Sequence, residues 1–277
     1  MAWTAEDRRK YAPAIQEVVR QGMIARLART IDPIDPIDPQ PKVGRERVWS
    51  TLIMLQALWH LTRDGCAWRR PPAMSPPYTT VRCRLHRWRE VAVLDRASAV
   101  LVARLRLARG RKRSPTAAII DTQSVRIGPQ RGPRGYDAGK KVKGRKRVLM
   151  VDSEGDPLGV RVVPADVHEH RALRALAPDL AAHPGLLLVW LDRGFAGDEP
   201  EAFLNGYRVT VEIVGIKDRQ GFQLERRRWK AEQTFGCLRR YRRLRVDDEM
   251  SCESSRGMAM LVALFMTGMR LERLIGS

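Results

Sequence analysis

The chain has 277 residues, of which 44% are hydrophobic, so it is long enough for one large domain or two smaller ones with a substantial core. It carries 51 Lys and Arg against 31 Asp and Glu, a formal net charge of +20 that is spread through the chain. Such a charge favours a polyanionic partner, with nucleic acid ahead of an anionic membrane surface.

The cysteine pattern and the apolar runs exclude several classes of protein. The four cysteines show no CxxC pairing, so we expect reduced thiols in a cytosolic protein, without a disulfide framework or a zinc site. The polar start of the sequence has no signal-peptide pattern. The longest apolar run, residues 257–269, is shorter than the roughly 20 residues that cross a bilayer, so a core helix explains it better.

The first third of the chain reads as helices joined by proline-rich segments. Residues 6–29 read as a helix of mixed charge, and the three Ile-Asp-Pro units in 30–42 exclude both a helix and a central strand. We interpret that segment as a stiff linker rather than a binding element. Further helices are predicted over 44–63, 79–90 and 91–109, the first of them from the spacing of Val48, Leu52, Leu55, Leu58 and Leu61.

The predicted helix over residues 79–90 is rich in arginine. It follows a proline-rich loop that closes on Thr79 and Thr80, a candidate N-cap region, and small helical DNA-binding modules have this order. Its arginines either reach phosphates and base edges or form the solvated face of a packing helix. The basic character of the whole chain favours DNA contact for Arg82, Arg84, Arg87 and Arg89.

From residue 117 the pattern changes to strands. Residues 117–125 are apolar up to Asp121, whereas 128–147 are rich in glycine and basic residues and read as a loop. A β-hairpin follows across the SEGDP turn, and then a helix over 169–182 that Pro178 should kink or stop. The remaining predictions are a strand LLLVWLD, a short helix GDEPEAFLN, a strand YRVTVEIVG, a basic helix over 225–244 and an apolar helix over 253–274.

This order predicts an α/β fold with an RNase H-like mixed sheet. A three-stranded meander, a helix and then parallel strands match that core, whereas a flavodoxin-like sheet needs a helix where SEGDP leaves room only for a turn. We therefore expect an N-terminal helix and proline-rich linker (1–42), a helical DNA-binding domain (43–112) and an RNase H-like catalytic domain (113–277).

Three carboxylates stand out by their position in this fold. Asp121 lies on the first strand and Asp192 ends the fourth, and these strands are neighbours in an RNase H-like sheet. Glu232 lies on the following helix with apolar residues around it at helical spacing, Trp229 among them, so its side chain can face the sheet. Converging carboxylates suit Mg²⁺ or Mn²⁺. For Asp192 alone, the alternative is a residue that caps the next turn.

Two further motifs have both a functional and a structural interpretation. His168-Glu169-His170 resembles a metal pair, but a strand-to-helix turn with Glu169 at the positive end of the helix is favoured. The run GKKVKGRKR resembles a nuclear-type signal, but a loop that contacts the DNA backbone explains it more simply. The residues assigned to that contact are Lys140, Lys141, Lys143, Arg145 and Lys146.

Five segments together carry a resemblance to a known family. They are IIDTQSV (119–125), RGYDAGKKVKGRKRVLMVD (134–152), PADVHEH (164–170), WLDRGFAG (190–197) and RRWKAEQTFGCLRRYRRL (227–244). With DGCAWRRPP and RLHRWRE before them, the sequence resembles bacterial insertion-sequence DDE transposases, most closely the insertion-sequence-five group, over roughly residues 40–275.

The resemblance implies a site and its partners. Asp121, Asp192 and Glu232 are then the catalytic triad and the ligands of Mg²⁺ or Mn²⁺, with two ions expected. The partner is double-stranded DNA, both the terminal inverted repeats of the element and the target. The short interval between Asp192 and Glu232 leaves no room for a large inserted β-domain.

The family signature around the glutamate is matched in part. It consists of a Tyr, an Arg three residues on, the Glu four further and a Lys seven beyond that. Arg228 and Glu232 match, but Glu225 replaces the Tyr and Arg239 replaces the Lys. Arg239 keeps the positive charge, although a planar guanidinium is not an ammonium, and the DNA-end contact of the Tyr is in question. The expected DNA contacts in this segment are Arg228, Arg239 and Arg240.

These inferences predict a DDE transposase in the bacterial cytoplasm, associated with the nucleoid and without membrane contact. A metal-activated water cuts at the element ends, and the freed 3′-OH attacks target DNA in one step. Two alternatives share part of the pattern: an RNase H-like nuclease that never joins ends, and a DNA-binding repressor or decayed transposase. Because two ends are processed, a homodimer is a further hypothesis.

Overall fold

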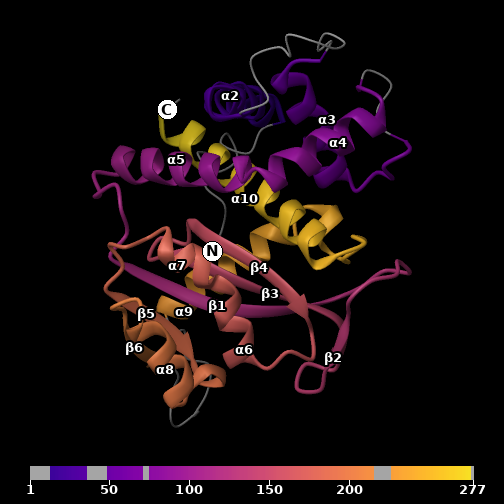
Figure 1. Cartoon of the computed structure of the whole chain (residues 1–277). Helices are drawn as coiled ribbons and strands as arrows, with labels where there is room; N and C mark the ends of the chain where they lie inside the picture. Colours follow the sequence, from indigo (N-terminus) through magenta and orange to yellow (C-terminus); the bar gives the residue numbers. More distant parts are fainter. Residues whose placement is uncertain (1–12, 36–48, 71–74, 215–225, 276–277) are drawn as a thin grey trace, which may run out of the picture.

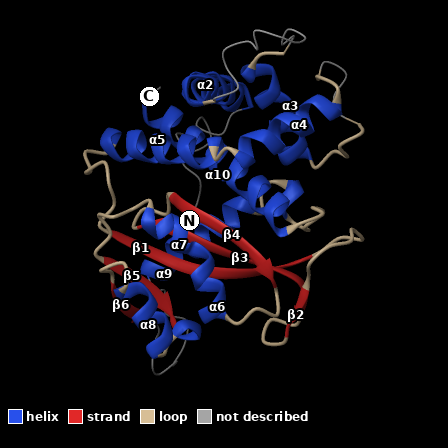
Figure 2. Ribbon diagram, viewed as in Figure 1, coloured by secondary structure: helices blue, strands red, loops and turns tan. Residues whose placement is uncertain are grey.

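A six-stranded mixed sheet is combined with a layer of helices in this protein (Figures 1 and 2). The computed structural model describes residues 13–35, 49–70, 75–214 and 226–275. No helix in these ranges is long and apolar enough to cross a membrane. The mixed α/β architecture with an N-terminal helical region confirms the predicted fold class.

The N-terminal region is helical, as predicted, with shifted boundaries. Its elements are α2 (Pro13–Ile31), η1 (Asp32–Ile34), α3 (Thr51–Asp64), α4 (Tyr78–Glu90) and α5 (Val93–Ala108). Ser50 caps α3 by accepting a hydrogen bond from the Ile53 amide at 3.4 Å, and Gly65 ends the helix with φ +71°. Val48 lies outside the described residues and Leu52 is exposed, so the predicted apolar stripe is shorter than expected.

The start of the predicted linker is folded. Helix α2 continues to Ile31 and η1 follows, so residues 30–35 belong to the helical layer. The Asp35 carboxylate is buried, and it accepts hydrogen bonds from Trp88 Nε1 at 2.7 Å and from Arg84 at 3.0 Å. Asp35, from the second Ile-Asp-Pro unit, therefore anchors the end of the α2–η1 segment to α4. The later part of the predicted linker, residues 36–42, lies outside the described residues.

The sheet has the strand order expected of an RNase H-like core. Its strands are β1 (Ala117–Arg126), β2 (Gly135–Asp137), β3 (Val142–Asp152), β4 (Pro157–Pro164), β5 (Leu188–Asp192) and β6 (Thr210–Val214). The order is β2-β3-β1-β5-β6, and β4 pairs with β3. Strands β1, β3 and β4 are antiparallel, whereas β5 and β6 run parallel to β1.

The predicted basic loop over residues 128–147 was partly wrong, because it contains β2 and the first half of β3. The other elements are α6 (Glu169–Leu173), η2 (Arg174–Leu176), α7 (Ala177–Ala181), η3 (Arg193–Phe195), α8 (Asp198–Asn205), α9 (Arg226–Leu238), η4 (Arg242–Leu244) and α10 (Cys252–Ile275). Pro178 lies in the first turn of α7, which explains why the predicted helix over 169–182 is broken. The predicted basic helix already ends at Leu238.

Side chains alternate across β1 and separate two hydrophobic cores. Ile120 faces the core built with α6, α7 and α8, whereas Ile119 faces the core built with α9, α10 and the N-terminal helices. Helix α10 packs against α2, α5 and β4 and is buried along most of its length. The larger core therefore contains residues from both sides of residue 113, the predicted start of the catalytic domain. The domain boundary itself stays a prediction.

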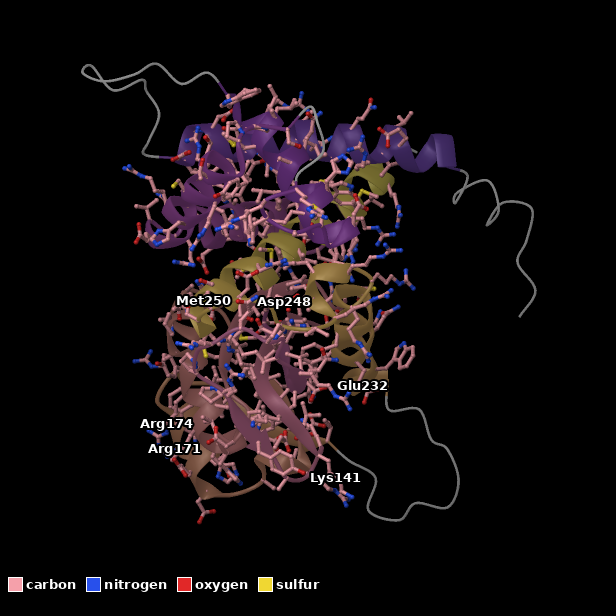
Figure 3. The ribbon with its side chains drawn as sticks, turned by 90° about the vertical axis from the view of Figure 1, so that its right-hand side faces the viewer. Lys141, Arg171, Arg174, Glu232, Asp248 and Met250 are labelled. Carbon is pink, nitrogen blue, oxygen red and sulfur yellow. The ribbon has the colours of Figure 1, made fainter. Side chains whose placement is uncertain are left out.

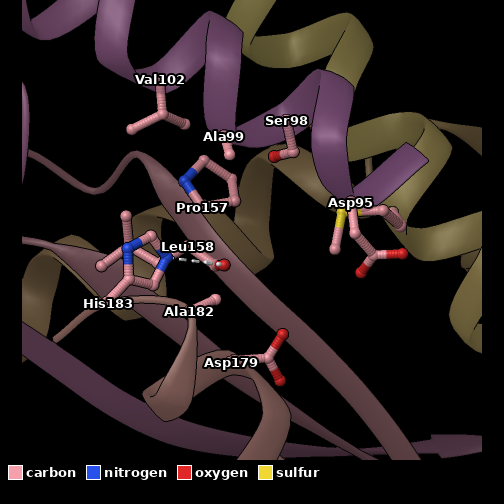
Figure 4. A pocket seen from close by; sticks show the side chains of 10 residues that line it. Asp95, Ser98, Ala99, Val102, Pro157, Leu158, Asp179, Ala182 and His183 are labelled. Carbon is pink, nitrogen blue, oxygen red and sulfur yellow. Dashed lines mark hydrogen bonds between the residues drawn. The ribbon is translucent and has the colours of Figure 1, made fainter. Parts of the chain in front are cut away.

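A small cavity marks where α5 meets the sheet (Figure 4). It measures about 50 Å³ and lies between Ser98 of α5, Leu158 of β4 and His183. His183 Nε2 lies 3.4 Å from the Leu158 carbonyl, and burial lowers the pKa of this histidine. The cavity has room for little more than water, so it belongs to the packing between the layers and not to a substrate site.

Candidate active site

Asp121 and Asp192 are brought together by the pairing of β1 with β5. The parallel register pairs Ile120 with Leu191, so the next residue on each strand places the two aspartates opposite each other. Neighbouring strands lie about 4.8 Å apart. Neighbouring residues of a strand point to opposite faces of the sheet. Ile120 and Leu191, which precede the two aspartates, both face the core built with α6, α7 and α8. The two carboxylates therefore share the other face of the sheet, which α9 covers.

Local hydrogen bonds orient both aspartates. Asp121 is buried, and its Oδ1 accepts from the Thr122 amide at 2.7 Å. Asp192 is half-buried, and its Oδ1 accepts from the Gly194 amide at 3.0 Å, which caps η3. The capping role that the sequence offered as an alternative is thus present. It does not exclude ligation, because a carboxylate has two oxygens and several acceptor positions.

Glu232 lies on α9, the helix that covers the carboxylate face of the sheet. This helix packs on β1, β3 and β5, and its buried side consists of Ala231, Thr234, Phe235 and Leu238. Glu232 is exposed at the margin of that side, and Trp229 is also exposed, so the expected apolar surroundings of Glu232 were partly wrong. Thr234 fixes the helix by donating to the Gly155 carbonyl at 2.9 Å.

The three carboxylates have the chemistry of a divalent-metal site. Oxygen donors of this kind are the ligands that Mg²⁺ and Mn²⁺ prefer. Across the described residues, however, no group of three or more His, Cys, Asp or Glu side chains is arranged to hold a metal ion. The fold therefore brings the two aspartates to one point of the sheet and supplies Glu232 from the covering helix, without closing a three-ligand cluster.

A second polar cluster lies on the opposite face of β1, directly beside Asp121. Thr122 Oγ1 donates to Glu169 Oε1 at 2.9 Å. Lys140 Nζ donates to the Thr122 carbonyl at 3.2 Å and lies 3.5 Å from Glu169 Oε1. Lys140 and Glu169 also line an open depression of about 520 Å³ between the β2–β3 and β4–α6 turns. The ammonium group of Lys140 is thereby held at Thr122, the residue that follows Asp121.

Glu169 is also close to Asp192. Gly194 has no side chain, and a Cβ at this residue would lie 2.0 Å from Glu169 Oε2 and 3.1 Å from Asp192 Oδ1. The two carboxylates therefore approach the same point. The sequence analysis placed Glu169 in a strand-to-helix turn, and it does begin α6. Its position beside Thr122 and Asp192 could be found only from the fold.

Asp137 completes this cluster from β2. Its carboxylate accepts from Ser124 Oγ at 2.5 Å and from the Lys140 amide at 3.0 Å. Burial acts to raise the pKa of Asp137, but these hydrogen bonds and the nearby lysines hold that pKa below its usual value. Asp137 stays ionised and fixes the turn from which Lys140 projects.

Two of the expected DNA contacts are wrong, because their side chains are buried. Arg145 is completely buried, where it pairs with Asp247 at 3.0 Å and donates to the Glu249 carbonyl at 2.8 Å. Lys146 is buried on the other face, and its Nζ donates to the Val167 carbonyl at 2.7 Å. Both residues hold distant segments of the chain to β3 and are removed from solvent.

The arginines of α4 divide into two pairs. Arg82 and Arg87 are exposed, as the DNA-contact prediction requires. Arg84 is held by Asp35 at 3.0 Å and stacks over Trp88, with its side chain 10% exposed. Arg89 donates to Ser254 of α10 at 3.0 Å and is half-buried. DNA contact stays a prediction for these arginines, and Arg84 and Arg89 also join α4 to the rest of the helical layer.

The other basic residues assigned to DNA lie at the surface where they are described. Lys140, Lys141 and Lys143 are exposed around the start of β3, and Arg239 and Arg240 are exposed after α9. Figure 3 places Lys141 and Glu232 on one side of the molecule and Arg171 and Arg174 on the other. The side chain of Arg228 and the whole of Glu225 lie outside the described residues.

Comparison with known proteins agrees with this geometry. The family described as "Transposase DDE domain" matches residues 112–250, which is half of the chain and contains the whole sheet with all three acids. This chain belongs to that family. The family described as "Putative transposase of IS4/5 family" matches residues 29–98 in the helical region. The DDE transposase is therefore of the IS4/5 insertion-sequence type.

One curated relative extends the comparison. The "Putative transposase for insertion sequence element IS402" of Burkholderia cepacia is 29% identical over 126 residues. The match covers 43% of this chain and 59% of the relative, so the chain spans about three fifths of that relative's length. Family membership thus rests on the DDE-domain match, and the relative supports the insertion-sequence assignment.

Proposed function

We propose that this transposase cuts DNA at the ends of its insertion sequence and joins the freed 3′-OH to target DNA. The observation that carries the proposal is the strand register that places Asp121 and Asp192 opposite each other under the helix of Glu232. The net charge of +20 supports a DNA substrate, both the terminal inverted repeats and the target. The protein would then act at the nucleoid in the bacterial cytoplasm.

The proposed catalytic residues are Asp121, Asp192 and Glu232, which would hold one or two Mg²⁺ or Mn²⁺ ions. Such ions, when bound, lower the pKa of an attacking water or hydroxyl and stabilise the leaving oxygen of a phosphodiester. The Thr122 amide and the Gly194 amide orient the aspartates by hydrogen bonds. The chain's own contribution is therefore to position negative charge and to hold the DNA strand against it.

Exposed basic residues supply the DNA contacts in this proposal. Those near the two aspartates lie around the β2–β3 turn, and others lie on α4 and beyond α9. They are Lys140, Lys141, Lys143, Arg82, Arg87, Arg239 and Arg240, with Arg228 expected from the family signature. A homodimer follows from the need to process two ends, and residues 43–112 act as the DNA-binding domain.

The test is a cut-and-join assay with labelled element-end DNA, a supercoiled target plasmid and either Mg²⁺, Mn²⁺ or EDTA. We expect joined products with either metal and none with EDTA. Asp192→Asn and Glu232→Gln should each lower product formation at least about 100-fold, because each removes a ligand whose charge stabilisation is worth several kcal/mol. Glu201→Gln, the same chemical change at an exposed position of α8, is the matched control.

The outcomes separate the three candidate functions. Cutting without joining by the unaltered chain would assign it to the RNase H-like nucleases. DNA binding without any chemistry in either metal would identify a non-catalytic relic or repressor. Full activity of Asp192→Asn would refute the proposed site itself.

A further inference from the structure

An arginine-lined pocket lies beside the end of α9, outside the acid site. It encloses about 430 Å³ between α2, α3, α10 and the segment that follows α9. Five arginines line it, one or more from each of these four elements: Arg20, Arg63, Arg240, Arg270 and Arg273. We call this the arginine pocket. Only Arg240 was assigned to DNA from the sequence.

The charge of the arginine pocket is strongly positive. Five guanidinium groups and one carboxylate, Glu17, line the pocket, and Arg270 also pairs with Asp156 at 2.6 Å. Hydrogen bonds from Arg20 and Gln21 lower the pKa of Glu17 to about 2, so this carboxylate stays ionised beside Arg20. Like charges gathered in one concave surface repel each other and draw in an anion.

Part of the pocket is held in place by contacts with the rest of the fold. Arg63 donates to the Arg240 carbonyl at 3.2 Å and its guanidinium lies 5.5 Å from the centre of the Tyr241 ring. Arg270 donates to the Gly155 carbonyl at 2.7 Å and to Asp156 at 2.6 Å. Because a guanidinium has five N–H donors, these bonds fix its position and use only part of its capacity.

The remaining wall of the arginine pocket is aromatic and apolar. Trp59 and Tyr241 meet edge to face with ring centres 5.7 Å apart, and Trp59 meets Phe265 in the same way at 5.2 Å. Met266 and Met269 complete this side. Arginines for phosphates and aromatic side chains for sugars or bases are the combination found where proteins hold single nucleic-acid strands.

The pocket is placed to meet a strand that is bound at the acid site. Glu232 and the pocket residue Cys237 both lie on α9, and the six steps of helix from Glu232 to Leu238 rise about 9 Å. Arg240 and Tyr241 follow directly. A cavity of this size has room for a nucleotide-sized group, whereas an intact duplex is much too wide to enter it.

We propose that the arginine pocket binds the phosphodiester backbone of one DNA strand next to the bond that is cut. This inference takes its partner, DNA, from the proposed function, but it does not depend on the chemistry of the acid site. Free polyphosphate offers the same charge, so the test must distinguish a DNA strand from a general anion.

The test measures binding of a single-stranded oligonucleotide without metal, in a Glu232→Gln background, over a series of salt concentrations. The pocket variant is Arg63→Gln with Arg273→Gln, both at exposed side chains. The control is Arg171→Gln with Arg174→Gln, which removes the same charge on the side away from Glu232 (Figure 3). If each pocket arginine neutralises one phosphate of a single strand, the steepness of log K against log salt should fall by about 1.4 in the pocket variant. The control should leave the slope unchanged.

Three results would overturn the proposal. The first is an equal salt slope for the pocket variant and the control. The second is competition by inorganic triphosphate that, at equal phosphate concentration, is as strong as competition by a single-stranded oligonucleotide. The third is loss of the cooperative thermal unfolding transition in the Arg63→Gln, Arg273→Gln protein, combined with an Arg240→Gln variant that folds normally and has a normal slope. A chain that binds DNA through the pocket but never cuts it would leave this inference standing while the proposed function fails.

Discussion

The run GKKVKGRKR changes role at Gly144. Before this glycine, Lys140, Lys141 and Lys143 are exposed, whereas after it Arg145, Lys146 and Arg147 are buried. A Cβ at residue 144 would lie 1.9 Å from the Val125 carbonyl, so only glycine allows β3 to approach β1 so closely here. The two halves carry the same kind of residue, but one half faces solvent and the other holds the fold together.

The difference shows that a basic residue in a DNA-binding protein is not by itself a DNA contact. Arg145 has a carboxylate partner in Asp247, and Lys146 has a carbonyl partner in Val167. Arg147 is buried with its Nη1 on the Leu244 carbonyl at 2.9 Å, while its Nε and Nη2 have no hydrogen-bond partner among the described residues. Burial lowers the pKa of Arg147 to about 10.

The largest effect should come from the buried half. Arg145→Met should lower the free energy of unfolding by about 3–5 kcal/mol, because it leaves the buried Asp247 carboxylate without its counter-charge. Arg147→Met removes donors that lack partners and should be neutral or stabilising by about 1–3 kcal/mol. Urea denaturation of both variants measures the contrast. Equal destabilisation would mean that the buried donors of Arg147 have partners of their own.

An intermediate effect is expected at the anchored lysine of the exposed half. Lys140→Ala should slow DNA cutting about tenfold, because it removes a cation held beside Asp121 that is worth roughly 1.5 kcal/mol toward a phosphate. Glu169→Gln should produce part of the same loss, since Glu169 fixes Lys140. Single-turnover cutting rates for both variants and for the double variant provide the measurement. Losses that simply add would show that Glu169 does not act through Lys140.

The smallest effect should come from an exposed lysine without such an anchor. Lys143→Ala should reduce the salt slope of DNA binding by about 1 and leave the free energy of unfolding within about 0.5 kcal/mol of the unaltered chain. Salt-dependent binding and urea denaturation check the two halves of this statement. A stability loss of several kcal/mol here would erase the contrast across Gly144.

Local patterns were enough to predict most of the elements, β2 excepted, and the strands that carry the two aspartates. The apolar run that ends in Asp192 and the hairpin around SEGDP are local features, because side-chain alternation and turn residues are read within a few positions. The pairing of Asp121 with Asp192 then followed from the expected strand order, and the register of β1 and β5 agrees with it.

What the sequence could not supply were contacts between distant segments. The burial of Arg145 depends on Asp247, and the folded start of the linker depends on Trp88 and Arg84. Glu169 meets Thr122 and Lys140 only because the fold brings the start of α6 to them. None of these contacts has a periodic signature, so composition alone assigned all basic residues of a segment to one role.

The position of α10 has a consequence for the synthesis of this protein. Helix α2 buries its apolar side partly against α10, which leaves the ribosome more than 200 residues later. At bacterial elongation rates of about 5–20 residues per second, α2 therefore waits roughly 10–40 s for that partner. During this interval the apolar side of α2 lacks the surface that α10 covers in the folded protein, and a chain released before α10 is made lacks the helix that joins the two parts of the larger core.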